Sequence, residues 1–207
     1  NEDLKAEEGI NFDIGAQGRW RLPVDALQRL SIGAAYFRND IDDMITKVYD
    51  ARGIGRSENV SGALVQGIET MATAEFYTHF RAVMNYTYQH TENESDNAAF
   101  HGKQISGLFK HAILGRLEAR HSGFTVFGEY IFETDKYYDT ANTRPAADKK
   151  ELNLGISWAR GPWLLRLEAK NLADEQYEDF NSYPLPGRSY YASVKYTYEA
   201  EPDTQKE

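Results

Sequence analysis

The feature that most constrains the fold of this chain is an alternation of apolar and polar side chains. In the run 151–158, Leu152, Leu154 and Ile156 share one parity, and polar residues or glycine occupy the other. The runs 163–170 and 189–198 follow the same pattern. Because successive side chains of a β-strand point to opposite faces, each run predicts a strand with one apolar and one polar face.

Similar alternation along the rest of the chain brings the predicted number of strands to about nine. Another run opens at 59–69. The remaining alternating runs are 10–22, 30–49, 80–89, 113–119 and 124–132. The alternation breaks at Asp42 and Asp43, which predicts a bulge there. Residues 50–58, with Gly53 and Gly55, are expected to form a loop.

The connections between the predicted strands alternate in length. Short links lie near Pro23, Ala74, Ser122 and Gly161, and long polar links lie near residues 52, 96, 142 and 180. This order predicts an all-β, antiparallel up-and-down transmembrane β-barrel wall with its long loops on one rim. A soluble β-sandwich binding module is the alternative fold, although Greek-key connections would not be sorted in this way.

Aromatic side chains support the membrane interpretation. Six aromatic residues lie on the apolar parity near the ends of predicted strands: Trp20, Tyr36, Trp158, Trp163, Tyr196 and Tyr198. Aromatic belts at membrane interfaces have this placement. A mean hydropathy of −0.64 is compatible with a barrel, because only every second strand residue meets lipid and long polar loops dilute the average.

Composition excludes several classes of protein. The 207 residues carry a net charge of −9, which argues against nucleic acid as a partner, since that would call for a basic patch. There is no Cys, so disulfides and thiolate metal sites are excluded. The sequence has no run of about 18 apolar residues, as a transmembrane helix would need, and it opens without a basic and apolar leader.

The link between the last two predicted strands, residues 171–187, is more distinctive than the strands. It begins Asn171-Leu172-Ala173-Asp174-Glu175-Gln176-Tyr177 and closes with Pro186-Gly187-Arg188. Upstream, Asn59-Val60-Ser61-Gly62-Ala63 precedes Gly67-Ile68-Glu69. Together these segments resemble the C-terminal part of the TonB-dependent outer-membrane receptors, in which an Asn-Leu-x-Asp-x-x-Tyr segment precedes Pro-Gly-Arg and a final aromatic-rich strand.

This resemblance implies a fragment of a larger barrel. Nine is an odd number, bacterial single-chain barrels have even numbers of strands, and large transporters of this kind use roughly 22 strands around a plugged lumen. We therefore expect residues 1–8 to be a polar lead-in and residues 9–198 to be the C-terminal portion of the barrel. The plug domain and the remaining strands would be partners absent from this sequence. Residues 199–207 form a polar acidic tail where such receptors usually end on an aromatic residue.

Enzyme chemistry has little support in the sequence, and no cofactor is expected. The five His residues lie in separate segments and do not form an HExxH motif, and neither a GxSxG motif nor a P-loop is present. A small self-contained outer-membrane barrel that acts as an enzyme or adhesin remains the alternative of another class, with His111 or His121 near Ser122 as the group to consider.

The resemblance implies a receptor in the outer membrane of a Gram-negative bacterium that takes up a ferric siderophore, powered by the TonB–ExbB–ExbD complex. Ferric siderophores are commonly anionic, so cationic and aromatic loop side chains would bind them. The candidates are Arg56, His101, Lys103, Tyr137, Tyr138 and Arg144, with Lys149 and Lys150 beside the last three. For any single one of these residues, a solvated loop side chain without a part in binding is the favoured interpretation.

Two other ligands are open within the same family. A cobalamin-like corrinoid is the second candidate. His101 raises haem as a further alternative, although the Phe-Arg-Ala-Pro and Asn-Pro-Asn-Leu segments that resemble haem receptors are absent.

Overall fold

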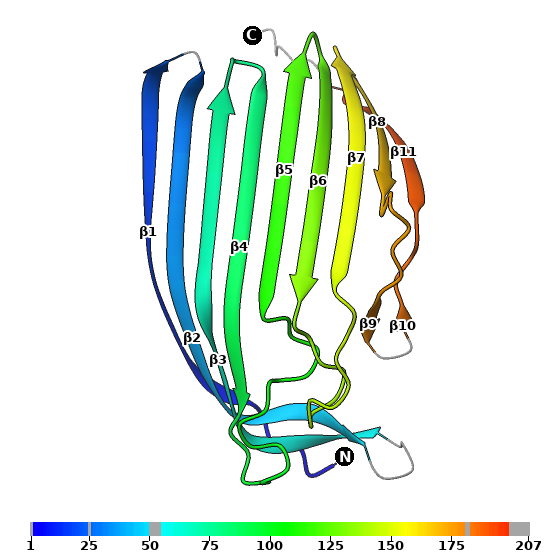
Figure 1. Ribbon diagram of the computed structural model, residues 1–207. Coiled ribbons are helices and arrows are strands. Elements are labelled where there is room, and N and C mark those ends of the chain that lie inside the picture. The colour runs from blue at the N-terminus through cyan, green and yellow to red at the C-terminus, as the bar shows by residue number, and fades with distance from the viewer. Residues whose placement is uncertain (1, 25, 50–54, 181–182, 199–207) are drawn as a thin grey trace, which may run out of the picture.

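Nine strands form one antiparallel sheet, in which each strand pairs with its neighbour along the chain. The structure, a computed structural model, describes residues 2–24, 26–49, 55–180 and 183–198. The strands of the sheet are β1 (Glu8–Val24), β2 (Leu27–Tyr49), β3 (Gly55–Phe76), β4 (Phe80–Asn93), β5 (His111–His121), β6 (Phe124–Thr134), β7 (Lys149–Arg160), β8 (Trp163–Lys170) and β11 (Ser189–Tyr196). The predicted nine-stranded meander is confirmed (Figure 1).

The register of the sheet aligns residues of the same character across neighbouring strands. Ile14 of β1 lies opposite Tyr36, and Tyr36 lies opposite Ile68 of β3. At the other side of the sheet, Val126 lies opposite Ile156, and Ile156 lies opposite Leu167. Because the alternation of each strand is in phase with its neighbours, the sheet has one continuous apolar face and one polar face.

The apolar face is exposed rather than buried. Ile14 is 63% exposed, Leu154 44% and Val194 67%. Within the described residues, the buried hydrophobic residues are only Ala63, Leu64, Phe127 and Tyr177. A soluble sheet buries its apolar face against another layer. In the described residues, no second layer buries this apolar face.

The apolar face has the height of a bilayer core. On β1, outward-facing residues run from Ile10 to Trp20, which is about 33 Å along the strand and about 25 Å in height at a strand tilt near 40°. Aromatic rings pair at the turn end of this band. Trp163 and Tyr196 have ring centroids 4.8 Å apart, and Phe124 and Trp158 have centroids 6.2 Å apart. This arrangement is typical of an interfacial belt.

The turns and the long loops lie at opposite ends of the sheet (Figure 1). At the turn end, Ser122 and Gly123 join β5 to β6 with φ of 48° and 84°, and Gly161 with φ of 56° begins the turn from β7 to β8. The long loops at the other end span residues 94–110, 135–148 and 171–188. The short and the long connections therefore lie at opposite ends of the sheet, as predicted.

Some sequence-based boundaries were wrong. Residues 55–58 belong to β3 and not to a loop, whereas residues 50–54 lie outside the described residues. The pairing keeps its register from Asp42↔Gly62 to Met44↔Val60, so the expected bulge is absent, and Asp43 instead adopts a φ of 52°. The link 171–187 contains two short strands, β9 (Glu178–Phe180) and β10 (Tyr183–Pro184), which the sequence did not indicate.

The tail 199–207 is not described. No helix in the described part of the chain has the length and apolar content needed to span a membrane.

Candidate functional site

Asn171 organises the link between β8 and β11. It is 2% exposed and has a φ of 48°. Its side-chain amide donates to the Glu175 carbonyl at 2.9 Å and its Oδ1 accepts the Glu175 amide at 3.0 Å. Its own backbone amide donates to Oδ1 of Asn153 on β7 at 2.9 Å. Asn171 thus closes a turn and fixes that turn to the polar face, which explains why Asn stands at the start of the link.

Tyr177 anchors the same link to the sheet. Its ring is 6% exposed and its hydroxyl donates to Oε2 of Glu151 at 2.6 Å. Lys149 lies 5.9 Å from the ring centroid, and its Nζ lies 3.4 Å from Oε1 of Glu133. Burial, followed by the hydrogen bond to Glu151, raises the pKa of Tyr177, so the hydroxyl keeps its proton and donates.

The end of the link is closed by Asp174. Its Oδ1 accepts the backbone amide of Arg188 at 2.8 Å. A Cβ at Gly187 would lie 2.6 Å from the same oxygen, so a side chain at this position would displace it. The Leu172 backbone amide donates to the Leu152 carbonyl of β7 at 2.8 Å, and the Leu185 backbone amide donates to the Tyr177 carbonyl within the link at 3.0 Å. These contacts hold the 171–188 link in its folded shape.

The upstream motif also has a structural explanation. The side-chain amide of Asn59 donates to the carbonyls of Asp43 at 2.5 Å and Lys5 at 3.1 Å, which fixes the left-handed residue of β2. A Cβ at Gly67 would lie 2.1 Å from the Tyr88 carbonyl and 2.8 Å from the Phe37 ring, so only glycine fits there. Glu69 lines an open pocket on the polar face, opposite Ala35 of β2 and Thr87 of β4.

We expect Tyr177→Phe to loosen the link without unfolding the sheet. The hydroxyl bond to a carboxylate is worth about 1.5 kcal/mol, so amides of residues 171–188 should exchange hydrogen about tenfold faster. Hydrogen exchange of the intact protein, followed by mass spectrometry, measures this. Tyr183→Phe, at a side chain that is 71% exposed, is the matched control. Equal exchange in both variants would contradict the anchoring role.

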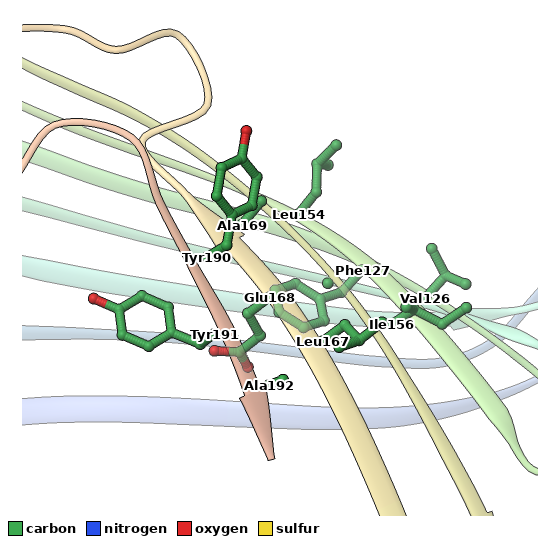
Figure 2. Close-up of a pocket in the computed structure, with 11 residues that line it drawn as sticks. Val126, Phe127, Leu154, Ile156, Leu167, Glu168, Ala169, Tyr190, Tyr191 and Ala192 are labelled. Atoms are coloured by element: carbon green, nitrogen blue, oxygen red, sulfur yellow. The ribbon is translucent and has the colours of Figure 1, made fainter.

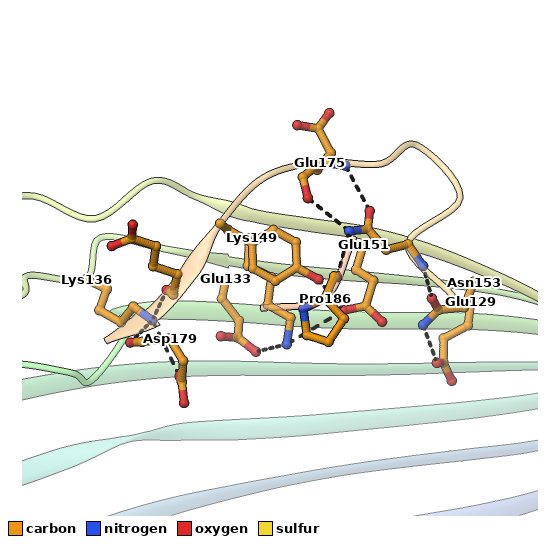
Figure 3. Close-up of polar contacts among 12 residues, drawn as sticks. Glu129, Glu133, Lys136, Lys149, Glu151, Asn153, Glu175, Asp179 and Pro186 are labelled. Carbon is orange, nitrogen blue, oxygen red and sulfur yellow. Dashed lines mark hydrogen bonds and ion pairs between the residues drawn. The ribbon is translucent and has the colours of Figure 1, made fainter. Parts of the chain in front are cut away.

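The second and third long loops are connected to each other through Lys136. Its Nζ donates to the carbonyls of Asp179 at 3.0 Å (Figure 3) and Glu178 at 3.4 Å. The Tyr138 hydroxyl donates to the Glu178 carbonyl at 3.4 Å. Burial, with the nearby Glu178 carboxylate, raises the pKa of Tyr138. Loop 135–148 is thus tied to link 171–188.

The first loop is connected to the second by a reciprocal pair. The backbone amide of Gln104 donates to Oδ1 of Asn142 at 2.7 Å, and Nδ2 of Asn142 donates to the backbone carbonyl of Gln104 at 2.9 Å. The Gly107 amide donates to the Tyr137 carbonyl at 2.9 Å. Loops 94–110, 135–148 and 171–188 therefore form one connected layer, which we call the loop layer.

The structure places five of the six predicted ligand residues in this loop layer. Arg144, His101 and Lys103 are exposed, whereas Tyr137 and Tyr138 are half-buried. Nδ1 of His101 lies 3.1 Å from the Ser95 carbonyl. Their direct participation in binding remains a prediction.

The turn that presents Arg144 is held by Asp139. Oδ1 of Asp139 accepts the Arg144 amide at 2.8 Å, and Oδ2 accepts the Thr143 hydroxyl at 2.8 Å. Burial alone would raise the pKa of Asp139, but the hydrogen bonds from Thr143 and Arg144 outweigh it, so the pKa lies below its usual value.

The other predicted residues lie elsewhere. Arg56 is in β3 and forms an ion pair with Glu58 on the same strand. Lys149 faces the polar side of the sheet, bound to Glu133, whereas Lys150 pairs in register with Phe132 on the apolar parity.

In the described part of the chain, three or more His, Asp or Glu side chains do not gather as a metal site would require.

Below the loop layer, the polar face carries a network of ion pairs. Glu118 is 6% exposed and accepts from Arg116 at 2.8 Å and from Arg120 at 2.7 Å, with Arg81 at 3.9 Å. Arg116 also reaches Glu129 at 3.2 Å, and Glu129 accepts from Asn153 at 3.2 Å. The wall beneath the loops is therefore polar and charged.

Comparison with known proteins gives concordant results. Residues 1–172 match the family described as TonB dependent receptor-like, beta-barrel. The vitamin B12 transporter BtuB of Vibrio vulnificus (strain CMCP6) is 24% identical over 199 residues, which is 96% of this chain and 31% of the transporter. The chain thus spans about a third of the length of that relative.

Two solved structures share the fold. The copper transporter OprC superposes with a TM-score of 0.73 at 16% identity, over 95% of this chain and 32% of that protein. The siderophore receptor PiuA of Acinetobacter baumannii superposes with a TM-score of 0.69 at 22% identity, over 92% of this chain and 28% of that receptor.

Proposed function

Because this chain belongs to the TonB-dependent receptor β-barrel family, we propose that it forms part of the wall of an outer-membrane receptor that takes up a ferric siderophore. Members of this family are receptors and transporters for small ligands, and their barrels lie in the outer membrane of Gram-negative bacteria. An exposed apolar face about as tall as a bilayer core supports the membrane location. Strands β1 and β11 each have a single partner strand among the described residues, which leaves edges for the rest of the barrel.

The observation that carries the ligand proposal is the loop layer. It joins three loops by hydrogen bonds, so its exposed cationic groups are presented on a braced support rather than on independent loops. Arg144 is exposed at one turn of this layer, and Lys103 and His101 at another. These exposed basic side chains supply charge-assisted hydrogen bonds to an anionic ferric complex, within a loop layer that carries nine Asp and Glu residues against five Lys and Arg residues. PiuA, whose fold this chain shares, is described as a siderophore receptor.

A cobalamin-like corrinoid is the second candidate ligand. The support is the match over 96% of the chain to a protein described as a vitamin B12 transporter. A corrinoid is bulky and less anionic than most ferric siderophores, so it would depend more on the tyrosines of the layer than on Arg144. In either case a plug domain would fill the barrel, and the TonB–ExbB–ExbD complex would deliver the energy for opening.

Replacing Arg144 and Tyr137 together by alanine should weaken ferric-siderophore binding by the full-length receptor. Losing one charge-assisted hydrogen bond corresponds to at least about a tenfold rise in Kd. Titration by intrinsic fluorescence with a ferric catecholate, a ferric hydroxamate and cyanocobalamin measures it. Arg29→Ala is the matched control, because Arg29 lies at the turn end of the sheet, paired with Glu75.

The three probes separate the candidates. Binding of a ferric siderophore that weakens in the double variant but not in Arg29→Ala supports the proposal. Binding of cyanocobalamin alone would replace it with the corrinoid alternative. Unaltered siderophore affinity in the double variant would remove Arg144 and Tyr137 from the site.

A further inference from the structure

A groove of about 520 Å³ lies on the apolar side of β6, β7, β8 and β11. It is hollow where the outward-facing residues are small, at Ala169 and Ala192. Leu154 and Tyr190 rise beside it, and Figure 2 shows both on one side of the sheet while the Glu168 carboxylate lies on the other. The groove is therefore an interruption in the apolar face.

The register shows how the hollow arises. Ala169 is directly opposite Leu154 on one side and Tyr190 on the other, so a short side chain stands between two long ones. In the next row, Ala192 lies opposite Leu167 at the β11 side. Because the rows continue the band of exposed apolar residues, the groove opens into the same apolar environment as the band.

Cationic groups lie toward the loop end of this groove. Lys150 has the same outward parity as Leu154 and stands four residues nearer the loops, about 13 Å along the strand. Its side chain is 49% exposed and lies 3.6 Å from Asp148. Arg188 is exposed and precedes Tyr190 by two residues. Glu168, the acidic residue of the lining, faces the polar side and contacts Arg166 at 3.6 Å.

We propose that this groove holds one acyl chain of a phosphate-bearing lipid, with the headgroup phosphate at Lys150 and Arg188. The inference rests on the proposed membrane location of the barrel. An apolar trough that ends at basic side chains matches a lipid, which has an apolar tail and an anionic head. Along the strands, Lys150 is about 13 Å and Arg188 about 7 Å from the row of Leu154, Ala169 and Tyr190, so both lie on the loop side of the groove. A protein partner would instead need a larger matched apolar surface without a charged end.

The test uses the full-length receptor, delipidated in a neutral detergent and titrated with dimyristoyl phosphatidylglycerol. Native mass spectrometry counts the lipids retained, and dimyristoyl phosphatidylcholine is the zwitterionic comparison. The double variant Ala169→Leu/Ala192→Leu fills the groove and should weaken retention of phosphatidylglycerol about tenfold. Lys150→Gln should reduce the preference for phosphatidylglycerol over phosphatidylcholine, since Arg188 remains. Ala72→Leu is the matched control, on the apolar parity of β3 opposite Ile32 and Met84.

Retention that falls in the double leucine variant and is unchanged in Ala72→Leu supports the site. Equal retention in all variants, or a receptor dimer that dissociates when the groove is filled, would overturn it. Ferric-siderophore affinity is measured on the same samples. If lipid retention is equal in all variants while siderophore binding persists, only the lipid site is refuted. A receptor that is monodisperse without detergent would refute the membrane location itself.

Discussion

Replacing Glu118 by alanine is expected to destabilise the full-length receptor by about 3 kcal/mol, the lower end of the cost of removing one partner from a buried ion pair. Glu118 is 6% exposed, and it accepts from Arg116 and Arg120 with Arg81 nearby. Without its carboxylate, three guanidinium groups would face one another without that shared counter-charge. The arginines are partly exposed, so water offsets some of the loss.

Urea unfolding of the receptor in phospholipid vesicles measures this difference. Glu75→Ala is the matched control, because Glu75 also pairs with an arginine on the polar face, but both partners are well exposed. That pair should contribute only about 0.5 kcal/mol. Glu118→Gln should lie between the two, since it keeps the shape and some hydrogen bonds but loses the charge. Equal losses in Glu118→Ala and Glu75→Ala would show that the ion-pair network does not stabilise the wall.

The polar network takes the place that a hydrophobic core has in a soluble protein. The few buried side chains of this sheet include Asn93, Glu118, Asn153 and Asn171. Uniqueness of the fold then depends on hydrogen-bonded partners on the polar face. The link 171–188 belongs to this network, since Asn171 and Tyr177 bind directly to strand residues of β7.

The strands could be predicted because alternation is a local property of the sequence. A run such as 10–22 carries its own phase, and up-and-down topology makes each strand pair with the next. The left-handed residue Asp43 could not be distinguished from a bulge, because both interrupt the alternation. What separates them is the hydrogen bond from Asn59, which is sixteen residues away.

The loop layer could not be predicted for the same reason. The reciprocal bonds between Gln104 and Asn142 join residues 38 positions apart, and the contact between Lys136 and Glu178 spans 42 positions. Amide and lysine side chains are common in any polar loop, so the sequence gives no signal for such pairs. The motif residue Tyr177 was found by resemblance, but its bond to Glu151 emerges only from the folded chain.

Replacing Met84 by lysine should destabilise the receptor by about 2–4 kcal/mol if the apolar face meets hydrocarbon. Met84 is 53% exposed and lies near the middle of the band on β4, opposite Ala72 and Gly115. In a soluble protein, an exposed Met replaced by Lys would change stability by no more than about 0.5 kcal/mol. The variant therefore distinguishes between lipid and water as the medium outside the sheet.

Thr87→Lys on the same strand is the matched control, because Thr87 has the opposite parity and lies opposite Glu69. A lysine there points into the polar lumen beside a carboxylate and should be nearly neutral. Urea unfolding in vesicles gives the difference between the two variants. If Met84→Lys were as stable as Thr87→Lys, the outer face would be in contact with water or polar protein, and the exposed rows from Ile14 to Val194 would need a protein partner to cover them. A large difference between two lysines three residues apart has one physical source, the change of solvent from one face of the sheet to the other.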